Sequence, residues 1–376
     1  MSMYRRRLMI ANALKKSSGI NYPGLIAAWS AKGKTNDDED RAILKDLTGN
    51  GHDITLNGFA FSEMSGYSGY NYRFNKTSNY TPPERLDVVV SATKISGLFK
   101  KLDGTLKQWF GKIYGVDSFC DKEYKIKVSG LQESESLQYA YYVRNVGVEY
   151  VDIHEDGIYT IPASTYEGIP SQGWAQFIKY IITEDRNLTI ELVPEYPDAL
   201  VFDGVDDYGS VYNIPKLTDC TFIGKFLITK EKSRNGFYAT STNKAGSSEG
   251  FLLLQGDNKD LIRRGDGRSY ENMTIPNGIL NKPLITANIR NTTTQTLTTY
   301  VNSVQGTMNC LGSNKPLGIN MTIGSSNTAN AKERLLNGAF YSLYVFDRVL
   351  SDEEIKSFIR KYIDPEYLLP SEQTTE

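Results

Sequence analysis

The chain has 376 residues, enough for two or three domains at roughly 100–200 residues each. Lys and Arg number 42 and Asp and Glu number 44, so the formal net charge is −2. This balance argues against a nucleic-acid-binding protein and against a polybasic membrane binder, because both need an excess of positive charge. Hydrophobic residues make up 40% of the chain and charged residues 23%, as in a typical globular protein. No apolar run approaches the roughly 18 residues of a membrane span.

Three cysteines, Cys120, Cys220 and Cys310, are far apart in the sequence. This spacing argues against a structural zinc site and against a disulfide framework, so we expect buried free thiols. Only His52 and His154 are available for a histidine-based metal or catalytic cluster. The 25 tyrosines, the 32 glycines and the many short Val/Ile/Thr/Tyr runs indicate an all-β protein, and we expect no cofactor.

The first 19 residues are basic and then weakly apolar, MSMYRRRLMIANALKKSSG. A secretory signal needs an apolar core of roughly 7–15 residues, and here Asn12 interrupts a shorter one, so we expect no signal peptide and assembly in the cytoplasm. The segment is a disordered tail, a peptide that orders on a partner, or an arm that binds a membrane or nucleic acid. The second hypothesis assigns residues 1–19 as a docking arm. Its docking residues would be Arg5, Arg6, Arg7, Leu8 and Leu14.

Residues 20–80 predict short strands separated by glycine-rich turns. GLIAAWSAKG (24–33) is a short apolar strand that places Trp29 in the core, and TGNG (48–51) is a tight turn in which Gly and Asn can take positive φ. A polar loop follows that carries Tyr67, Tyr70, Tyr72 and Tyr80. Aromatic rings in such loops stack on sugars or pack between domains or subunits, and both interpretations stay open.

Residues 84–197, after the Pro82-Pro83 boundary, contain strand-like runs roughly 10–15 residues apart, which predict a small β-sandwich. From Ala199 the earlier pattern returns. The last strand runs into a helix with Ser351 as N-cap and Glu354 three residues later, a capping box. Pro365 ends that helix, and residues 365–376 form a polar tail. The predicted apolar face of this helix consists of Ile355, Phe358, Ile359 and Tyr362.

Three segments resemble the laminin-G-like, concanavalin A-like jelly-roll modules: LKDLTGNGHDITLNGFAF (44–61), ALVFDGVDDYGSV (199–211) and LLNGAFYSLYVFDRVLSDEEI (335–355). The resemblance implies an all-β jelly-roll sandwich made of residues 20–80 and 199–364 and split by the inserted β-sandwich of residues 84–197. The opening RRRLMIANALKK followed by such a split module is also similar to virion structural proteins of Bacteroides crAss-like phages. That second resemblance implies a head fibre or a surface decoration.

The string EYVDIHEDG (149–157) comes nearest to the paired carboxylates of a glycoside hydrolase. On a strand, Glu149 and Asp152 point to opposite faces, and Asp152 and Asp156 lie roughly 13 Å apart, whereas the catalytic pair needs about 5–10 Å. We therefore expect no enzymatic activity.

Oxygen-bearing side chains in two glycine-rich turns suggest a calcium site. Asp and Asn also hydrogen-bond their own backbone in such turns, and we favour that interpretation and expect no metal. The residues concerned are Asp46, Asn50, Asp53, Asp203, Asp206 and Asp207.

The sequence thus predicts a non-enzymatic phage virion protein with a lectin-like domain. Its expected partners are other virion proteins of the capsid or tail through the arm, a host surface glycan, and further copies of itself, with neither nucleic acid nor membrane. A bacterial carbohydrate-binding protein is the first alternative. A glycan depolymerase is the second.

Overall fold

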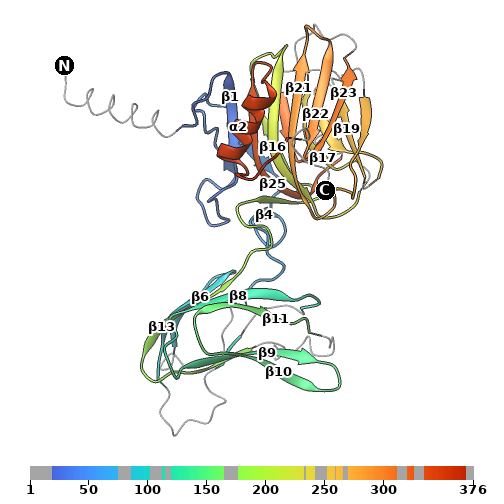
Figure 1. Cartoon of the computed structure of the whole chain (residues 1–376). Coiled ribbons are helices and arrows are strands. Elements are labelled where there is room, and N and C mark those ends of the chain that lie inside the picture. The colour runs from blue at the N-terminus through green and yellow to red at the C-terminus, as the bar shows by residue number, and fades with distance from the viewer. Residues whose placement is uncertain are drawn as a thin grey trace, which may run out of the picture. The chain divides into compact units, whose positions relative to one another are not determined.

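The computed structural model describes residues 19–74, 86–101, 112–114, 120–164, 177–232, 234–241, 252–258, 260–265, 270–310, 320–325 and 334–369. The chain forms two compact units (Figure 1). The first unit combines residues 1–69 with residues 196–376, and the second contains residues 70–195. The first boundary between the units thus lies between Gly69 and Tyr70. The predicted boundary, between residues 80 and 84, is later in the chain and lies outside the described residues.

The first unit is a sandwich of two 8-stranded antiparallel sheets, which confirms the predicted jelly-roll. One sheet has the order β23 (Val304–Asn309), β22 (Thr296–Val301), β21 (Pro283–Asn291), β16 (Cys220–Ile228), β25 (Asn337–Phe346), β14 (Leu200–Asp203) and β4 (Gly66–Tyr67), and β1 (Leu25–Ser30) also pairs with β25. The other has the order β2 (Ile43–Leu44), β3 (Ile54–Asn57), β15 (Tyr208–Val211), β24 (Asn320–Ile323), β17 (Gly236–Ser241), β18 (Leu252–Gln255), β19 (Leu261–Gly265) and β20 (Tyr270–Thr274).

Large apolar side chains fill the space between these two sheets. Trp29 is fully buried, as predicted, and its Nε1 donates a hydrogen bond of 2.7 Å to the carbonyl of His52. Phe226 of β16 stacks on Phe237 of β17 with ring centroids 4.8 Å apart, so the two sheets meet through aromatic contacts. The core is continuous from β1 to β23.

Helix α2 (Asp352–Tyr362) covers the outer face of the first sheet, in front of β1 and β16 in Figure 1. The predicted capping box is present: the Ser351 side chain accepts from the Glu354 backbone N–H, and the Glu354 side chain accepts from the Ser351 N–H. The buried side chains of α2 are Ile355, Phe358 and Ile359, and Phe358 packs edge-on against Tyr344 and Phe346 of β25.

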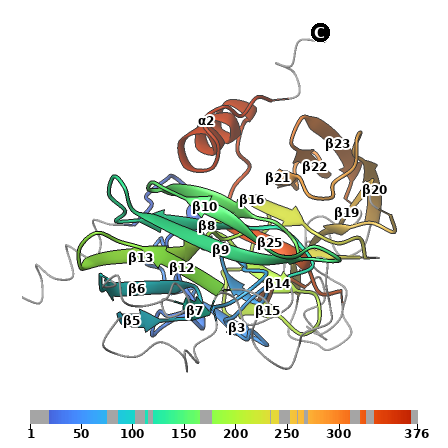
Figure 2. The ribbon, with the colours of Figure 1, turned by 90° about the horizontal axis from the view of Figure 1, so that it is seen from below.

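The second unit is the predicted inserted β-sandwich, with its own hydrophobic core. A 5-stranded sheet has the order β11 (Gly157–Ile161), β8 (Tyr124–Ser129), β13 (Arg186–Leu192), β6 (Lys94–Phe99) and β5 (Leu86–Val90). A 4-stranded sheet has the order β10 (Gly147–Ile153), β9 (Ser136–Val143), β12 (Phe177–Ile181) and β7 (Lys112–Tyr114). Figure 2 shows these strands from below.

The three cysteines are buried free thiols, as expected from their spacing. Within the described part of the chain, no helix is both long and apolar enough to cross a membrane.

Candidate functional site

Three carboxylates converge in the turn that joins β14 to β15, which we call the acidic turn (Asp203–Asp207). One oxygen each of Asp203, Asp206 and Asp207 lies within 4.8 Å of the other two. Asp206 is exposed, Asp203 is half-buried and Asp207 is fully buried. Val205 lies between them with 73% of its side chain exposed. The turn therefore presents an apolar side chain beside carboxylate oxygens.

Hydrogen bonds within and next to the turn fix its shape. Asp203 Oδ1 accepts from the Val205 N–H at 2.7 Å, and Asp207 Oδ2 accepts from the Asp203 N–H at 3.0 Å. Ser65, which precedes β4, donates its hydroxyl to Asp207 Oδ1 at 3.0 Å. Asp207 therefore acts as the internal anchor of the turn.

Two side chains from other loops donate to the backbone of the acidic turn. Asn337 Nδ2 donates to the Asp203 carbonyl at 2.9 Å, and Lys232 Nζ donates to the Gly204 carbonyl at 3.0 Å. Asn337 is itself held, because its N–H donates to Oδ1 of the fully buried Asn235 at 2.8 Å. The start of β25 and the loop between β16 and β17 thus support one turn.

Gly58 allows the β3–β4 segment to lie directly against the acidic turn. It has a φ of +85°, and a Cβ at this position would lie 2.2 Å from the Asp206 carbonyl oxygen. Any larger residue would push the two segments apart.

Burial has the largest electrostatic effect on the turn, and repulsion between its carboxylates adds to it. Burial, together with the negative charges of Asp203 and Asp206, raises the pKa of Asp207 to about 7. Among the described residues, no hydrogen bond engages the Asp206 carboxylate. The accessible groups are hydrogen-bond acceptors with a lysine nearby, a set that can bind hydroxyl groups or a cation.

The structure does not assemble the six-residue calcium set suggested by the sequence. Asp46 uses its carboxylate oxygens to accept from the backbone N–H groups of Ala28, Thr48 and His52. Asp53 accepts from the Asp46 N–H, and Asn50 donates to the Ile26 carbonyl. In the described ranges, the only cluster of residues whose ligand atoms lie close enough together to hold a metal ion consists of Asp203, Asp206 and Asp207. Asp46, Asn50 and Asp53 therefore shape their own turn.

The tyrosines proposed for sugar stacking do not form one aromatic surface. Tyr67 is 1% exposed in the jelly-roll core, and Tyr72 is 6% exposed in the core of the inserted unit. Their hydroxyls bond to the Arg41 carbonyl and to Asp121, respectively. Tyr70 is half-buried against the core of the inserted unit, and Tyr80 lies outside the described residues. The prediction does not hold for Tyr67 and Tyr72, because a buried ring has no face to offer a sugar.

Two further predictions meet different outcomes. The docking residues Arg5, Arg6, Arg7, Leu8 and Leu14 lie outside the described residues.

The string at 149–157 is not one strand, since β10 ends at Ile153 and β11 begins at Gly157. Asp156 lies in the turn between them and accepts from the Leu131 N–H at 2.9 Å, which is a structural task.

Sequence reasoning missed the side chains that support the acidic turn: Ser65, Lys232, Asn235 and Asn337. They come from three segments far apart in the sequence, so no local pattern joins them. The only signal was the Asn-Gly pair at 235–236 and again at 337–338, which reads simply as turn chemistry.

No protein-family model and no curated protein sequence matches the chain. Solved structures similar to part of it include the CBM40 module of Ruminococcus gnavus IT-sialidase bound to alpha2,3 sialyllactose, with 15% identity, 38% of this chain and 83% of that chain covered, and a TM-score of 0.32. The heptameric SAP-like pentraxin from Limulus polyphemus matches with 16% identity, 43% and 80% coverage, and a TM-score of 0.34. The K499G mutant of the NanB sialidase from Streptococcus pneumoniae matches with 19% identity, 37% and 24% coverage, and a TM-score of 0.31.

Proposed function

We propose that the protein is a non-catalytic carbohydrate-binding protein whose glycan contacts the acidic turn. The observation that carries the proposal is the exposed Asp206 carboxylate beside the exposed Val205 on a turn held by side chains from three other segments. A sugar presents adjacent hydroxyls and a C–H face, so it takes a carboxylate acceptor and an apolar side chain together.

Preorganisation supports this assignment. A turn that is already hydrogen-bonded loses little conformational entropy when a ligand binds, so weak polar contacts contribute more to affinity. Lys232 Nζ lies at the same turn and offers a donor to sugar oxygens.

Glycan cleavage fits the same turn poorly. Asp207, with its pKa near 7, has the protonation behaviour of a general acid. A general acid must reach the glycosidic oxygen, however, and Asp207 is 0% exposed and bonded to Ser65. This favours binding over hydrolysis.

The test is a glycan array followed by titration calorimetry of the best oligosaccharide. The Asp206→Asn variant should weaken binding about tenfold or more, as expected when a charge-assisted hydrogen bond is lost. Asp37→Asn is the matched control, because Asp37 is an exposed carboxylate in another loop. Absence of binding to every glycan, or binding that is equal for Asp206→Asn and the parent chain, contradicts the proposal.

We further propose that the chain works on a phage particle, attached through residues 1–19, as a head fibre or surface decoration. The support is the similarity of its opening segment to phage virion proteins, and many copies on one particle would give weak sugar binding useful avidity. Proteomics of purified particles from a Bacteroides host should find the chain. Deletion of residues 2–19 should abolish attachment and leave the melting transition intact. If the chain is absent from the particles and is found only in host cells, the result favours a bacterial carbohydrate-binding protein instead.

A further inference from the structure

The two lateral sides of the jelly-roll end in different kinds of strand. On one side the sheets end in β2 and β4, each only 2 residues long, and in β1, whose outer edge is covered because the Ala28 carbonyl accepts from the Leu47 N–H and the Ala28 N–H donates to Asp46 Oδ1. On the other side they end in β20, with 5 residues, and β23, with 6 residues. Very short edge strands are a common protection against unwanted pairing, and this second side lacks it.

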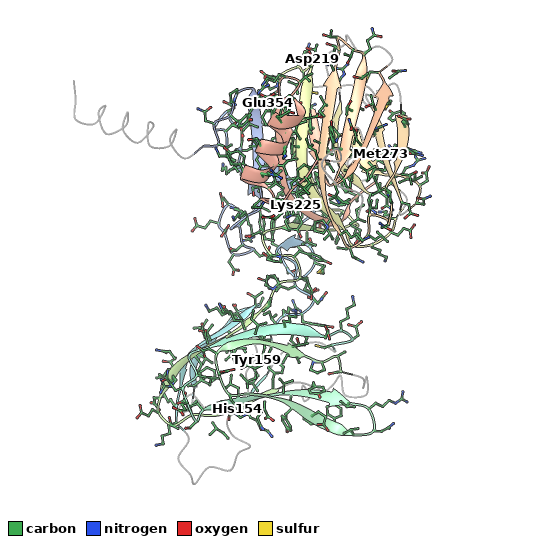
Figure 3. The ribbon with its side chains drawn as sticks, viewed as in Figure 1. His154, Tyr159, Asp219, Lys225, Met273 and Glu354 are labelled. Carbon is green, nitrogen blue, oxygen red and sulfur yellow. The ribbon has the colours of Figure 1, made fainter. Side chains whose placement is uncertain are left out.

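Strands β20 and β23 lie opposite each other across the sandwich. A Cβ on Gly306 of β23 would lie 2.8 Å from Met273 Sδ of β20, and Met273 marks this side of the molecule in Figure 3. Met308 of β23 belongs to the same core cluster as Met273. The side is thus a well-packed part of the fold.

Strand β23 also lacks the other protections of an edge. It pairs with β22 in an unbroken register from Thr296↔Asn309 to Val301↔Val304, without a bulge. Its sequence, VQGTMN, contains no charge and no proline. No Asp, Glu, Lys, Arg or His occurs between Arg290 and Lys315, although charged residues make up 23% of the chain.

An edge strand presents a row of backbone N–H and C=O groups on its unpaired side, and those groups are satisfied best by another strand. None of the described strands pairs with β23 except β22. We infer that β23 is a self-association edge, on which β23 of a second copy of this chain adds antiparallel about a two-fold axis. The first sheet of each copy would then continue into that of the other.

The side chains of β23 fit a second copy of the same strand. Gln305, Thr307 and Asn309 are exposed, and Val304 and Met308 contact the core, so the two sets face opposite sides of the sheet. An antiparallel pair centred on Gly306 sets Val304 against Met308 on the core face and Gln305 against Thr307 on the outer face. The strand itself has no charge, and the Arg264 guanidinium that lies beneath Gly306 is neutralised by Glu271 at 2.8 Å.

Apart from the covered β1 and the two-residue β2 and β4, the other described edges carry or adjoin charged residues that oppose pairing of two identical strands. β20 contains Glu271, β5 contains Asp87 and β10 contains Glu149 and Asp152. Glu155 and Asp156 directly precede β11. Charges within or next to a strand disfavour self-pairing, so β23 stands out among them.

The experiment is the molar mass of the full chain by light scattering after gel filtration, over a range of protein concentrations. The parent chain should reach twice the monomer mass of 42.2 kDa at high concentration. The double variant Gln305→Lys with Thr307→Lys should stay at the monomer mass, since two lysines per strand repel in a two-fold pair. Both side chains are exposed, so the fold should be retained, which circular dichroism and the melting temperature verify.

The control is Thr55→Lys with Thr218→Lys, which adds the same two charges at exposed positions outside β22 and β23 and should still dimerise. A parent chain that is monomeric at every concentration overturns the inference. So does a double-lysine variant that still dimerises. A trimer also contradicts it, because isologous pairing of one edge closes at two copies. In the dimer, hydrogen exchange of the β23 amides should slow relative to the lysine variant.

Discussion

Glu135 of the inserted unit and Asp207 of the jelly-roll are both buried carboxylates, and burial acts on both in the same direction. Their pKa values nevertheless shift in opposite directions. Burial opposes ionisation of Glu135, but hydrogen bonds from Thr183, Gln132 and Arg186 outweigh it and lower the pKa of Glu135. Burial raises the pKa of Asp207 to about 7, because the two neutral donors that reach it within the described residues do not offset that burial and the charges of Asp203 and Asp206 add to it.

Burial raises the pKa of both acids, and their partners decide whether that rise is overcome. Glu135 has a cationic partner, since Arg186 Nε lies 2.9 Å from Glu135 Oε2. Asp207 has no cationic partner among the described residues, and the neighbouring carboxylates repel it. The first is a structural clasp, while the second stores electrostatic strain in the turn proposed to bind the glycan.

Removing the clasp should have the largest effect. Glu135→Ala leaves Arg186 and the Thr183 hydroxyl without their partner, and because the Arg186 side chain is 25% exposed we expect the inserted unit to lose about 1–3 kcal/mol of unfolding free energy. Urea denaturation measures it. Glu133→Ala, two residues away and exposed, is the control and should change little. Equal effects of the two variants would show that the clasp contributes no stability.

The pH dependence of Asp207 follows from its raised pKa. In the unfolded chain this group has a pKa near 3.8, so between about pH 4 and pH 7 the folded chain binds more protons. Its contribution to stability is fully present below about pH 4 and is lost as the pH rises to about 7. Titration of the Asp207 carboxyl carbon by NMR should give a midpoint near 7, and a midpoint near 4 would refute the assignment.

Glu135 should show the opposite dependence. Because its pKa is lowered in the folded chain, its contribution is present above the ordinary value of 4.5 and is lost as the pH falls through the lowered value. A low pH should therefore lower the stability of the inserted unit and reduce the repulsion between carboxylates in the acidic turn. Hydrogen exchange measured separately for β13 and β14 at pH 3 and pH 8 distinguishes the two trends.

A smaller effect is expected when one of the repelling neighbours is removed. Asp206→Asn should lower the pKa of Asp207 by less than about one unit, because burial is the larger cause of the shift. The same NMR titration provides the measurement. A shift beyond about two units would mean that charge, rather than burial, governs Asp207.

The smallest change is expected on removal of divalent cations. Both oxygens of Asp207 and one of Asp203 already accept hydrogen bonds, which leaves few ligands for calcium. EDTA should shift the melting temperature by less than about 1 °C, since a ligand stabilises only the state that binds it. A clear decrease in EDTA that added calcium reverses would establish a metal site.

Local patterns predicted what local physics decides. The capping box at Ser351, the burial of Trp29 and the alternation in the strands all follow from neighbours within a few residues. The burial of Tyr67 and Asp207 was missed because it depends on segments far away in the sequence, such as the Arg41 carbonyl for Tyr67 and Ser65 for Asp207. Both residues have polar neighbours in the sequence, and this pattern indicated an exposed loop although both side chains are buried.

The discontinuous jelly-roll also sets an order of events during synthesis. β1 pairs with β25, so β1 leaves the ribosome early but stays without its pairing strand until β25 has been synthesised. The inserted unit is one continuous stretch and can fold while β16 to β25 are still being made. The jelly-roll therefore has a high contact order, and its closure should be the slow step of folding. A stalled chain that lacks β25 would expose β1, β14 and β16 together, as a substrate for chaperones and proteases.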